Sequence, residues 1–558
     1  MLQFKDDLHK YLQLSLREFF AESGEDSPGI DLEVPNDKSH GDFSTNIALK
    51  SARILKKPPL RLAEEFLPII RKEIETSPLN SFIDRVEVLR PGFINFYVSL
   101  PGLAAVVERV HSQNEDYGRE NVGAGVKVNI EFVSANPTGP LSVAHARQAA
   151  VGDALGNIFA FLGYGVVKEY YVNDEGNQIN LLGLSVKLRA AELLGESVAL
   201  PEDGYQGDYV RDMARIFLEQ KGITEAPVLE ALDPQEFNRF GVEYLMDVIR
   251  TDLADFGVRF DTWSRQSEIA STEKTAETLT FLKKRDVLYE DEGALWFRTT
   301  QFGDDKDRVL KKSDGSFTYF APDIAYHKNK FDRGCQKIID ILGPDHHGYI
   351  PRLTAAVEAL GHSREDINVL IVQLATIYRQ GKPVSMSTRR GQYISLREVI
   401  DEVGTDAARF FFLMRHISAH LDFDLELAKK QSPENPVYYV QYAHARINSI
   451  TEKAGENSLQ PKTTDYKLLT ESETTDLIKK IGAFPDVLVL CVREHDPYAL
   501  VNYLQELASI FHKFYDQHRV VDPDQPELSA ERLGLILAVK KVLANGLHLL
   551  GLNAPEKM

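Results

Sequence analysis

The spacing of apolar residues along the chain predicts three structural parts. Residues 1–112 open with apolar side chains three or four positions apart, as on one face of a helix. A second helical pattern near 44–55 ends before two prolines, and apolar residues then alternate around Pro91 and Gly92. These patterns predict a small α+β N-terminal domain.

Residues 113–425 alternate between strand and helix patterns. Apolar residues alternate near 126–132, and a turn rich in Pro and Gly leads into a proline-free helical run of about 142 to 162. Further buried strands are predicted at 166–172, 337–342 and 367–375, and helical stretches dominate from about 180 to 300. This alternation predicts a Rossmann-like domain, a doubly wound parallel sheet interrupted by a helical insertion.

Residues 426–558 lose the strand patterns and keep helical periodicity to the end of the sequence. We expect an all-α C-terminal domain there, because apolar positions spaced for helices form one continuous series. The sequence shows no internal repeat and no low-complexity tract, so a solenoid has no support. Multidomain α/β is therefore the predicted fold class.

The composition is that of a folded protein with several domains. The chain has 558 residues, of which 43% are hydrophobic and 26% are charged, so disorder, collagen and coiled coil have no support. Asp and Glu number 83 against 64 Lys and Arg, which gives a formal net charge of −19. A nucleic-acid partner therefore requires a local basic patch.

Cysteine usage and the lack of long apolar runs predict a cytoplasmic location. Cys335 and Cys491 are too few and too far apart in sequence for a disulfide framework or a Cys-based zinc site, which fits a reducing compartment. The first residues intersperse charge with apolar side chains and lack the apolar core of a signal peptide. No stretch approaches about 18 uninterrupted apolar residues, so we expect no membrane span.

The strand, turn and helix predicted between Ile130 and Asp153 indicate a phosphate site. Backbone N–H groups and the positive end of the helix meet at the carboxyl edge of a parallel sheet, where an anion such as a triphosphate binds. His145 falls in the first turn of that helix, where it can donate to a phosphate and so stabilise charge that builds during displacement. The alternative is an ordinary turn beside a structural histidine.

The segment 136–145, NPTGPLSVAH, resembles the HIGH signature of class I aminoacyl-tRNA synthetases, and specifically of the arginyl branch. His145 falls on the second histidine of the signature, whereas Ser142 replaces the first and Ala144 replaces the glycine. The resemblance implies an ATP site that includes Gly139, Ala144 and His145, with catalytic roles for His145 and Ser142. It also makes the Rossmann-like part the catalytic domain.

A second segment, 385–389 (SMSTR), resembles the KMSKS signature of the same family. The resemblance implies that Met386 and Ser387 contact ATP, and that Arg389 carries the charge of a missing lysine in ATP binding and catalysis. From the residues alone, the basic side chains here either clamp a pyrophosphate leaving group or form a solvated loop. An arginine presents a planar fork where lysine presents a point charge, so the two are not equivalent.

A helix start is predicted directly after this segment. Ser395 and Glu398 have the spacing of a capping box, so a helix should begin near residue 396. A long loop at about 380–393 should precede it. Lys382 and Arg390 lie in this loop and are further candidates for binding pyrophosphate.

Tyr319 and Asp323 stand four positions apart in a helical stretch, so both can face one cavity. A carboxylate opposite a buried guanidinium pairs through two hydrogen bonds, a geometry that lysine cannot match. Taken alone, Asp323 also fits a helix cap or a surface position. In the arginyl family these two residues line the side-chain pocket, which implies that they bind arginine here.

The resemblance implies three further arginine-binding residues. Glu131 and Asn136 are expected to hold the backbone of the amino acid. Gln266 occupies the position where the family usually places a glutamate that binds the guanidinium, and a neutral amide binds that cation more weakly. Glu268 is the alternative if the register differs by two residues.

The segment 342–349, LGPDHHGY, ends a predicted strand. The resemblance places Gly343, Asp345 and His346 beside ATP. Two adjacent histidines also suggest a metal, but neighbouring side chains diverge and no second Cys or His pair supports a site. We therefore predict no metal ligands here.

The terminal parts resemble the tRNA-binding domains of the same family. The N-terminal part is similar to an extra domain that contacts the tRNA elbow, and the C-terminal part to a helical anticodon-binding domain. Tyr438, Tyr442 and Arg446 offer faces on which splayed bases stack. The alternative is a helix that buries about half of its tyrosines. Segments 171–178 and 205–209 also resemble this family.

The resemblance implies an arginine–tRNA ligase activity in translation. ATP with Mg²⁺ and L-arginine would form arginyl-adenylate, and the terminal ribose of tRNA(Arg) would then attack it. We expect a monomer with no tightly bound cofactor, no DNA partner and no membrane partner. Two alternatives are a catalytically weakened synthetase-like protein that binds tRNA or regulates, and an unrelated nucleotidyltransferase.

Overall fold

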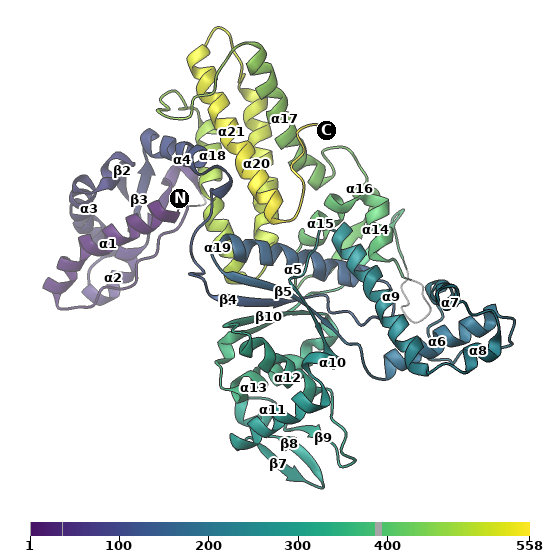
Figure 1. The fold of residues 1–558 in the computed structure, drawn as a ribbon. Helices are drawn as coiled ribbons and strands as arrows, with labels where there is room; N and C mark the ends of the chain where they lie inside the picture. The colour runs from purple at the N-terminus through teal and green to yellow at the C-terminus, as the bar shows by residue number, and fades with distance from the viewer. Residues whose placement is uncertain (1, 36, 385–392) are drawn as a thin grey trace.

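The computed structural model describes residues 2–35, 37–384 and 393–558 (Figure 1). The N-terminal part is the predicted α+β unit, with helices packed on a three-stranded antiparallel sheet of order β1-β3-β2. Its elements are α1 (Leu2–Ser23), β1 (Phe43–Thr45), α2 (Ile47–Leu55), α3 (Pro59–Thr76), β2 (Ile83–Leu89) and β3 (Phe93–Val98). A separate apolar core holds this unit together.

A five-stranded parallel sheet of order β11-β10-β4-β5-β6 lies at the centre of the molecule. Its strands are β4 (Lys127–Glu131), β5 (Gly165–Val172), β6 (Thr262–Arg265), β10 (Lys337–Leu342) and β11 (Ile367–Ile371). Helix α5 (Val143–Phe161) covers one face, and α12 (Phe320–Asp332) and α13 (Ile350–Leu360) cover the other (Figure 1). The predicted doubly wound sheet is therefore confirmed.

The order of the strands places a ligand crevice between β4 and β10. The chain leaves β4 through α5 to reach β5 on one side, and it returns much later to β10 on the other. In open parallel sheets, ligands bind outside the carboxyl ends of the strands at such a switch point.

The stretch from 180 to 300 contains more strand than the sequence predicted. Helices α6 (Asn177–Leu193), α7 (Asp208–Lys221), α8 (Ala226–Glu230), α9 (Pro234–Asp255), α10 (Gln266–Ile269) and α11 (Thr272–Lys284) fill most of it. However, β6 joins the central sheet, and β7 (Leu288–Asp291), β8 (Ala294–Phe297) and β9 (Arg308–Lys311) form an antiparallel sheet. Strands of four residues are too short to show alternation. The missed signal is the hairpin turn at Glu292 and Gly293, whose φ angles are 48° and 77°.

The predicted strand at 367–375 is two strands in different sheets. β11 ends at Ile371, and β12 (Ala375–Arg379) pairs with β13 (Lys382–Pro383) and β14 (Leu421–Asp424). Helices α14 (Leu396–Val403), α15 (Thr405–Leu413) and α16 (Leu425–Ala428) complete this region. Short 3-10 turns lie at Lys38–His40, Pro78–Ser81, Asn114–Asp116, Thr299–Phe302, Pro344–Tyr349 and Arg364–Asp366.

The C-terminal part is helical, as predicted. Its helices are α17 (Pro436–Glu456), α18 (Ser472–Gly482), α19 (Phe484–Glu494), α20 (Tyr498–Gln517) and α21 (Pro526–Leu549). Their core is continuous with that of the central sheet. Helix α4 (Leu100–Gln113) links the N-terminal part to these helices, and the Asn545 amide donates to the carbonyls of Asn114, Glu115 and Tyr117. Helix α21 of the C-terminal part thus stabilises residues 114–117, at the start of the central part.

Two further findings concern the whole described chain. None of its helices combines the length and apolar character needed to cross a membrane. Cys335 and Cys491 are both buried free thiols.

Candidate active site

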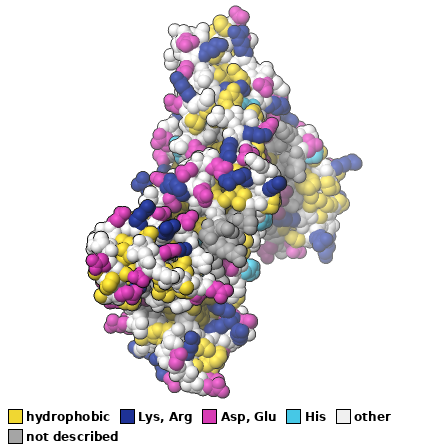
Figure 2. All heavy atoms as spheres, turned by 90° about the vertical axis from the view of Figure 1, so that its right-hand side faces the viewer, with side chains coloured by type: hydrophobic (Ala, Val, Ile, Leu, Met, Phe, Trp, Pro, Cys, Tyr) yellow, Lys and Arg dark blue, Asp and Glu magenta, His cyan; other side chains and the backbone are white. Residues whose placement is uncertain are grey.

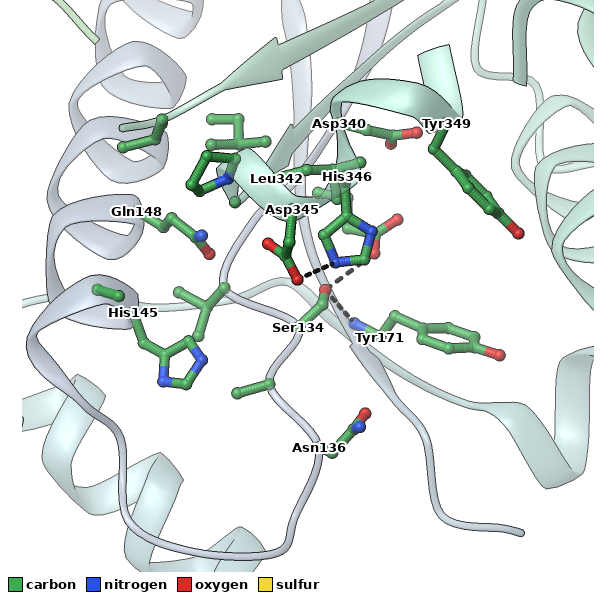
Figure 3. Close-up of a pocket in the computed structure, with 18 of the residues that line it drawn as sticks. Ser134, Asn136, His145, Gln148, Tyr171, Asp340, Leu342, Asp345, His346 and Tyr349 are labelled. Carbon is green, nitrogen blue, oxygen red and sulfur yellow. Dashed lines mark hydrogen bonds and ion pairs between the residues drawn. The ribbon is translucent and has the colours of Figure 1, made fainter. Parts of the chain in front are cut away.

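A cavity of about 600 Å³ lies at the carboxyl ends of β11, β10, β4 and β5 (Figure 3). This is the switch point of the sheet, where the fold predicts a ligand. Nine of the residues predicted for ATP or arginine line it: Glu131, Asn136, Ala144, His145, Tyr319, Asp323, Gly343, Asp345 and His346. Gly139, Ser142 and Gln266 are not among the lining residues, and Met386, Ser387 and Arg389 lie outside the described residues.

His145 stands at the start of α5, and its ring points into the cavity (Figure 3). The backbone N–H of Ser142 donates to His145 Nδ1 over 3.2 Å, and the Ser142 hydroxyl lies 3.3 Å from the same nitrogen. Nδ1 therefore accepts, and the proton of the neutral ring sits on Nε2. Burial lowers the pKa of His145 to about 4, although the charge of Asp345 opposes this shift. His145 is a neutral donor at physiological pH.

This geometry predicts the tautomer of His145 in solution. In enzyme with ¹⁵N-labelled histidine, we expect the Nε2–H signal pattern of His145 to persist unchanged from pH 8 to about pH 5, because the lowered pKa keeps the ring neutral. NMR of the imidazole nitrogens, assigned with a His145→Ala variant, measures it. A titration near the ordinary value of about 6.5, or an Nδ1–H pattern, would contradict the assignment.

Ser142 is buried at the N-terminus of α5, where it contacts His145 instead of the cavity. The family resemblance implied a catalytic role for Ser142. Its place in the structure supports a role through the histidine ring. Ala144, one residue before His145, does line the cavity, and its small methyl group leaves the space open.

Asp345 and His346 line the cavity from the turn that follows β10 (Figure 3), and Gly343 lines it at the start of that turn. A Cβ at Gly343 would stand 2.8 Å from the Asp345 carboxylate and 3.5 Å from the Gln148 amide, so a larger residue would displace the acid. Gln148, on α5 one turn after His145, also lines the cavity and lies next to this turn. The sequence analysis did not single out Gln148, because one amide in a helix that also carries His145, Arg147 and Asp153 is no signal of its own.

A buried ion cluster forms the floor of the cavity. The Lys330 ammonium donates to Glu131 over 2.5 Å and to Asp340 over 2.7 Å. His327 places Nε2 2.8 Å from the Asp340 carboxylate and Nδ1 2.8 Å from the carbonyl of Asp323. Because both ring nitrogens face acceptors, the imidazolium form is favoured.

The pKa directions agree with a neutral cluster of two cations and two anions. Burial alone lowers the pKa of His327 and of Lys330, but the charge of Asp340 outweighs it and raises both pKa values. Burial raises the pKa of Asp340, yet the Lys330 charge brings it below its ordinary value. Glu131 and Asp340 therefore carry little net charge to offer a ligand.

Asp323 differs from these acids because the described residues pair it with no Lys or Arg. Its one side-chain hydrogen bond comes from the Tyr349 hydroxyl over 2.5 Å. Burial raises the pKa of Asp323. A carboxylate in this state gains most from a cation supplied by a ligand. Tyr319, predicted beside it, lies at the rim of the cavity with 78% of its surface exposed.

Asn136 and Gln266 lie at the edge of this region. The Asn136 amide lines the cavity and donates to Gln178 over 2.7 Å. Gln266 accepts from the Tyr171 hydroxyl over 2.9 Å, and Tyr171 lines the cavity in its place. Glu268, the alternative to Gln266, is exposed and also outside the lining. Gln266 can therefore act on a ligand through Tyr171.

The second phosphate segment falls partly outside the described residues. Lys382 is exposed on β13, and Arg390 lies with the signature residues in the part of the chain that is not described. The capping box is confirmed: Ser395 Oγ accepts from the Glu398 N–H over 3.2 Å, and Glu398 accepts from the Ser395 N–H over 2.7 Å. Helix α14 begins at Leu396, as predicted.

The residues predicted to bind tRNA form a column on α17. Tyr438 and Tyr442 stack with ring centroids 5.8 Å apart, and the Arg446 guanidinium lies 4.6 Å from the Tyr442 ring. All three are half-buried, and the Tyr442 ring also stacks on His512 with centroids 5.9 Å apart. Neighbouring His444 is buried instead, with Nδ1 2.8 Å from the Pro555 carbonyl.

On the face shown in Figure 2, basic and acidic side chains of the described residues intermingle.

Among the described residues, no group of three or more His, Cys, Asp or Glu side chains has the arrangement needed to hold a metal ion. His346 Nε2 lies 3.4 Å from the Asp345 carboxylate, and His347 is outside the lining. Of the two adjacent histidines, His346 therefore lines the cavity and His347 does not.

Three protein families match consecutive parts of the chain. Residues 6–98 match the arginyl tRNA synthetase N-terminal domain, and residues 106–415 match the catalytic domain of the class I (R) tRNA synthetases. Residues 440–558 match the DALR anticodon binding domain. Together these matches cover nearly the whole chain in one order.

Individual relatives agree over the full length. The arginine–tRNA ligase of Desulfosudis oleivorans is 47% identical over 540 residues, which cover 95% of each chain. That of Bacillus licheniformis is 44% identical and covers 100% of this chain and 99% of its own. The structure of Thermus thermophilus arginyl-tRNA synthetase superposes with a TM-score of 0.74 at 22% identity, over 99% of this chain and 100% of the other, which shows a common fold.

Proposed function

The chain belongs to the arginyl-tRNA synthetase family of class I, and we propose that its cavity carries out the family reaction with the residues described above. That reaction is the ATP-dependent ligation of L-arginine to tRNA. It has two steps. The arginine carboxylate attacks the α-phosphorus of ATP, which releases pyrophosphate, and the terminal ribose hydroxyl of the tRNA then attacks the acyl carbon, which releases AMP.

Asp323 is the observation that carries the choice of arginine. Lys330 and His327 neutralise Glu131 and Asp340, whereas the one side-chain hydrogen bond that Asp323 accepts from the described part of the chain comes from the Tyr349 hydroxyl. A guanidinium placed against Asp323 supplies the missing cation and forms charge-assisted hydrogen bonds. Lysine lacks the planar fork, so it gains less at the same position.

His145 is assigned to the phosphate side of the cavity. Its Nε2–H points into the open space at the N-terminus of α5, where the helix dipole also favours an anion. A neutral donor there stabilises charge that builds on the phosphate oxygens during displacement. Ser142 holds the ring in this tautomer. Gly343, Asp345, His346 and Ala144 are assigned to the ATP side, with Gly139 in the turn that precedes them.

Glu131 and Asn136 are assigned to the backbone of arginine, with Tyr319 at the rim and Gln266 behind Tyr171. Met386, Ser387 and Arg389 stay predictions for the pyrophosphate side, and Tyr438, Tyr442 and Arg446 for the anticodon. ATP would bring Mg²⁺ as part of the substrate. We also assign a cytoplasmic location and a monomeric state, in line with the free buried thiols and the self-contained cavity.

A catalytically weakened, tRNA-binding role gains no support from the site. The substitutions at Ser142 and Ala144 leave the histidine donor in place and the cavity open. The full-length match also disfavours an unrelated nucleotidyltransferase, which would not need the anticodon-binding part.

The function predicts that activation depends on tRNA. Arginyl enzymes of this class generally need bound tRNA before they activate the amino acid, so arginine-dependent ATP–pyrophosphate exchange should be negligible without tRNA and clear with it. Because phosphate contacts supply much of the affinity, the tRNA concentration required should rise steeply with salt. Robust exchange by nuclease-treated enzyme without tRNA would contradict the coupling.

A further inference from the structure

The turn that leads into α5 is held by two tyrosine hydroxyls from distant parts of the chain. Tyr209 donates to the carbonyl of Thr138 over 2.7 Å, and Tyr393 donates to the carbonyl of Pro140 over 2.9 Å. Tyr209 opens α7 in the helical insertion, whereas Tyr393 precedes α14. No other hydrogen bond to these two carbonyls is found among the described residues.

Gly139 fits between the two hydroxyls with little room to spare. A Cβ at this position would stand 3.3 Å from the oxygen of Tyr209 and 3.3 Å from that of Tyr393. Both phenols are half-buried, and burial raises the pKa of each, so both remain donors at neutral pH. Hydrogen bonds therefore hold the turn at the residues on both sides of Gly139.

The same turn is also paired through its backbone. The Leu396 N–H donates to the Leu141 carbonyl over 2.7 Å, and the Val143 N–H donates to the Ile394 carbonyl over 3.3 Å. These bonds place the N-termini of α5 and α14 side by side, with Ser142 opposite Ser395. His145 follows within one helical turn, so the position of the turn sets the position of its ring.

We propose that Tyr209 and Tyr393 are positioning residues for adenylate formation, which hold the 138–140 turn so that the His145 ring meets the phosphate. The inference rests on the proposed function. It assigns a role to the 205–209 segment, because the Tyr209 hydroxyl connects the helical insertion to the turn that precedes His145. It also ties the segment that follows residues 385–392 to the same point through Tyr393.

The geometry favours positioning over simple packing. A Tyr→Phe change keeps the phenyl ring and removes only the hydroxyl, so one carbonyl of the turn would lose its partner. Loss of one such hydrogen bond changes an equilibrium by about three- to tenfold. Asp323 lies on α12 and accepts from Tyr349, both outside this turn, so arginine binding should be spared.

The test compares Tyr209→Phe and Tyr393→Phe with Tyr244→Phe. Tyr244 belongs to the same helical insertion and packs on its core, so it is a matched control. In the presence of tRNA, each of the first two variants should lower kcat for arginine-dependent exchange about three- to tenfold, with KM for arginine within about twofold of wild type. The control should match wild type.

A second arm asks whether the tyrosines act through His145. In a His145→Ala background, Tyr209→Phe should cost less than about twofold, because the group that it positions is gone. Gly139→Ala should slow exchange in the wild type and less so in the Tyr209→Phe, Tyr393→Phe double variant, where both oxygens near the new Cβ are absent. Fully additive losses would overturn the proposal.

A third readout does not depend on activity. The imidazole nitrogen resonances of His145 should shift in Tyr209→Phe and stay fixed in Tyr244→Phe. Unchanged resonances together with control-level exchange would overturn the proposal. Failure of the wild-type enzyme to exchange with arginine would instead count against the proposed function, and the resonances would still decide the role of the tyrosines.

Discussion

Replacing His145 with alanine is expected to lower the turnover of arginyl-adenylate formation by roughly 10²-fold or more, the scale of losing one donor to a developing oxyanion. The Nε2–H of this ring faces the cavity, and Ser142 fixes its direction through Nδ1. Arginine binding should change little, because the ion cluster and Asp323 are held by other elements. The loss should therefore appear in kcat.

The measurement is ATP–pyrophosphate exchange with saturating tRNA and arginine. His347→Ala is the matched control, since it deletes the same ring from an exposed position outside the cavity lining. The control should keep wild-type turnover. Full activity in His145→Ala would show that the histidine takes no part in the reaction. A rise in KM for arginine as large as the fall in kcat would indicate that the whole cavity has collapsed.

Replacing Asp323 with asparagine is expected to raise KM for arginine. The loss of binding free energy should be roughly 2–5 kcal/mol, as when a buried guanidinium loses the carboxylate that pairs with it. The amide keeps the shape of the carboxyl and still accepts from Tyr349, so the cavity should hold its form. KM for ATP should stay nearly fixed. Asp332→Asn on the same helix is the control, because Asp332 is exposed and pairs with Lys328.

The pH dependence gives this prediction a second signature. Burial raises the pKa of Asp323 in the free enzyme, and a guanidinium binds the ionised form. KM for arginine should therefore rise as the pH falls through that raised pKa. Asp323→Asn should lack this acid limb. Equal damage to the kinetics of ATP and arginine, or an unchanged acid limb, would mark Asp323 as structural.

The sequence predicted the elements that carry a local signal. Strand β4, helix α5 and the start of α14 were predictable because alternation, a proline-free run and a capping box each lie within a few residues. The short strands β7 to β9 were not, since four residues give too little pattern. The break after β11 was also missed, because one apolar run continues from one sheet into the next.

Local patterns pointed to His145 and Asp323 as candidates, whereas most other candidate site residues came from the family resemblance. Lys330 reads as a surface residue in a charged stretch, yet it is fully buried between Glu131 and Asp340. That contact forms only when α12 packs on the sheet, so no local sequence pattern predicts it. The partner of Asp323, Tyr349, is likewise 26 residues away in sequence.

Purified enzyme with tRNA, tested for ATP–pyrophosphate exchange against each of the twenty amino acids, is the most direct test of an arginine-activating cavity. We predict exchange with L-arginine alone, and less than about one hundredth of that rate with lysine, whose ammonium cannot pair with Asp323 through a planar fork. Exchange driven better by another amino acid, or none with arginine when tRNA is bound, would contradict the assignment.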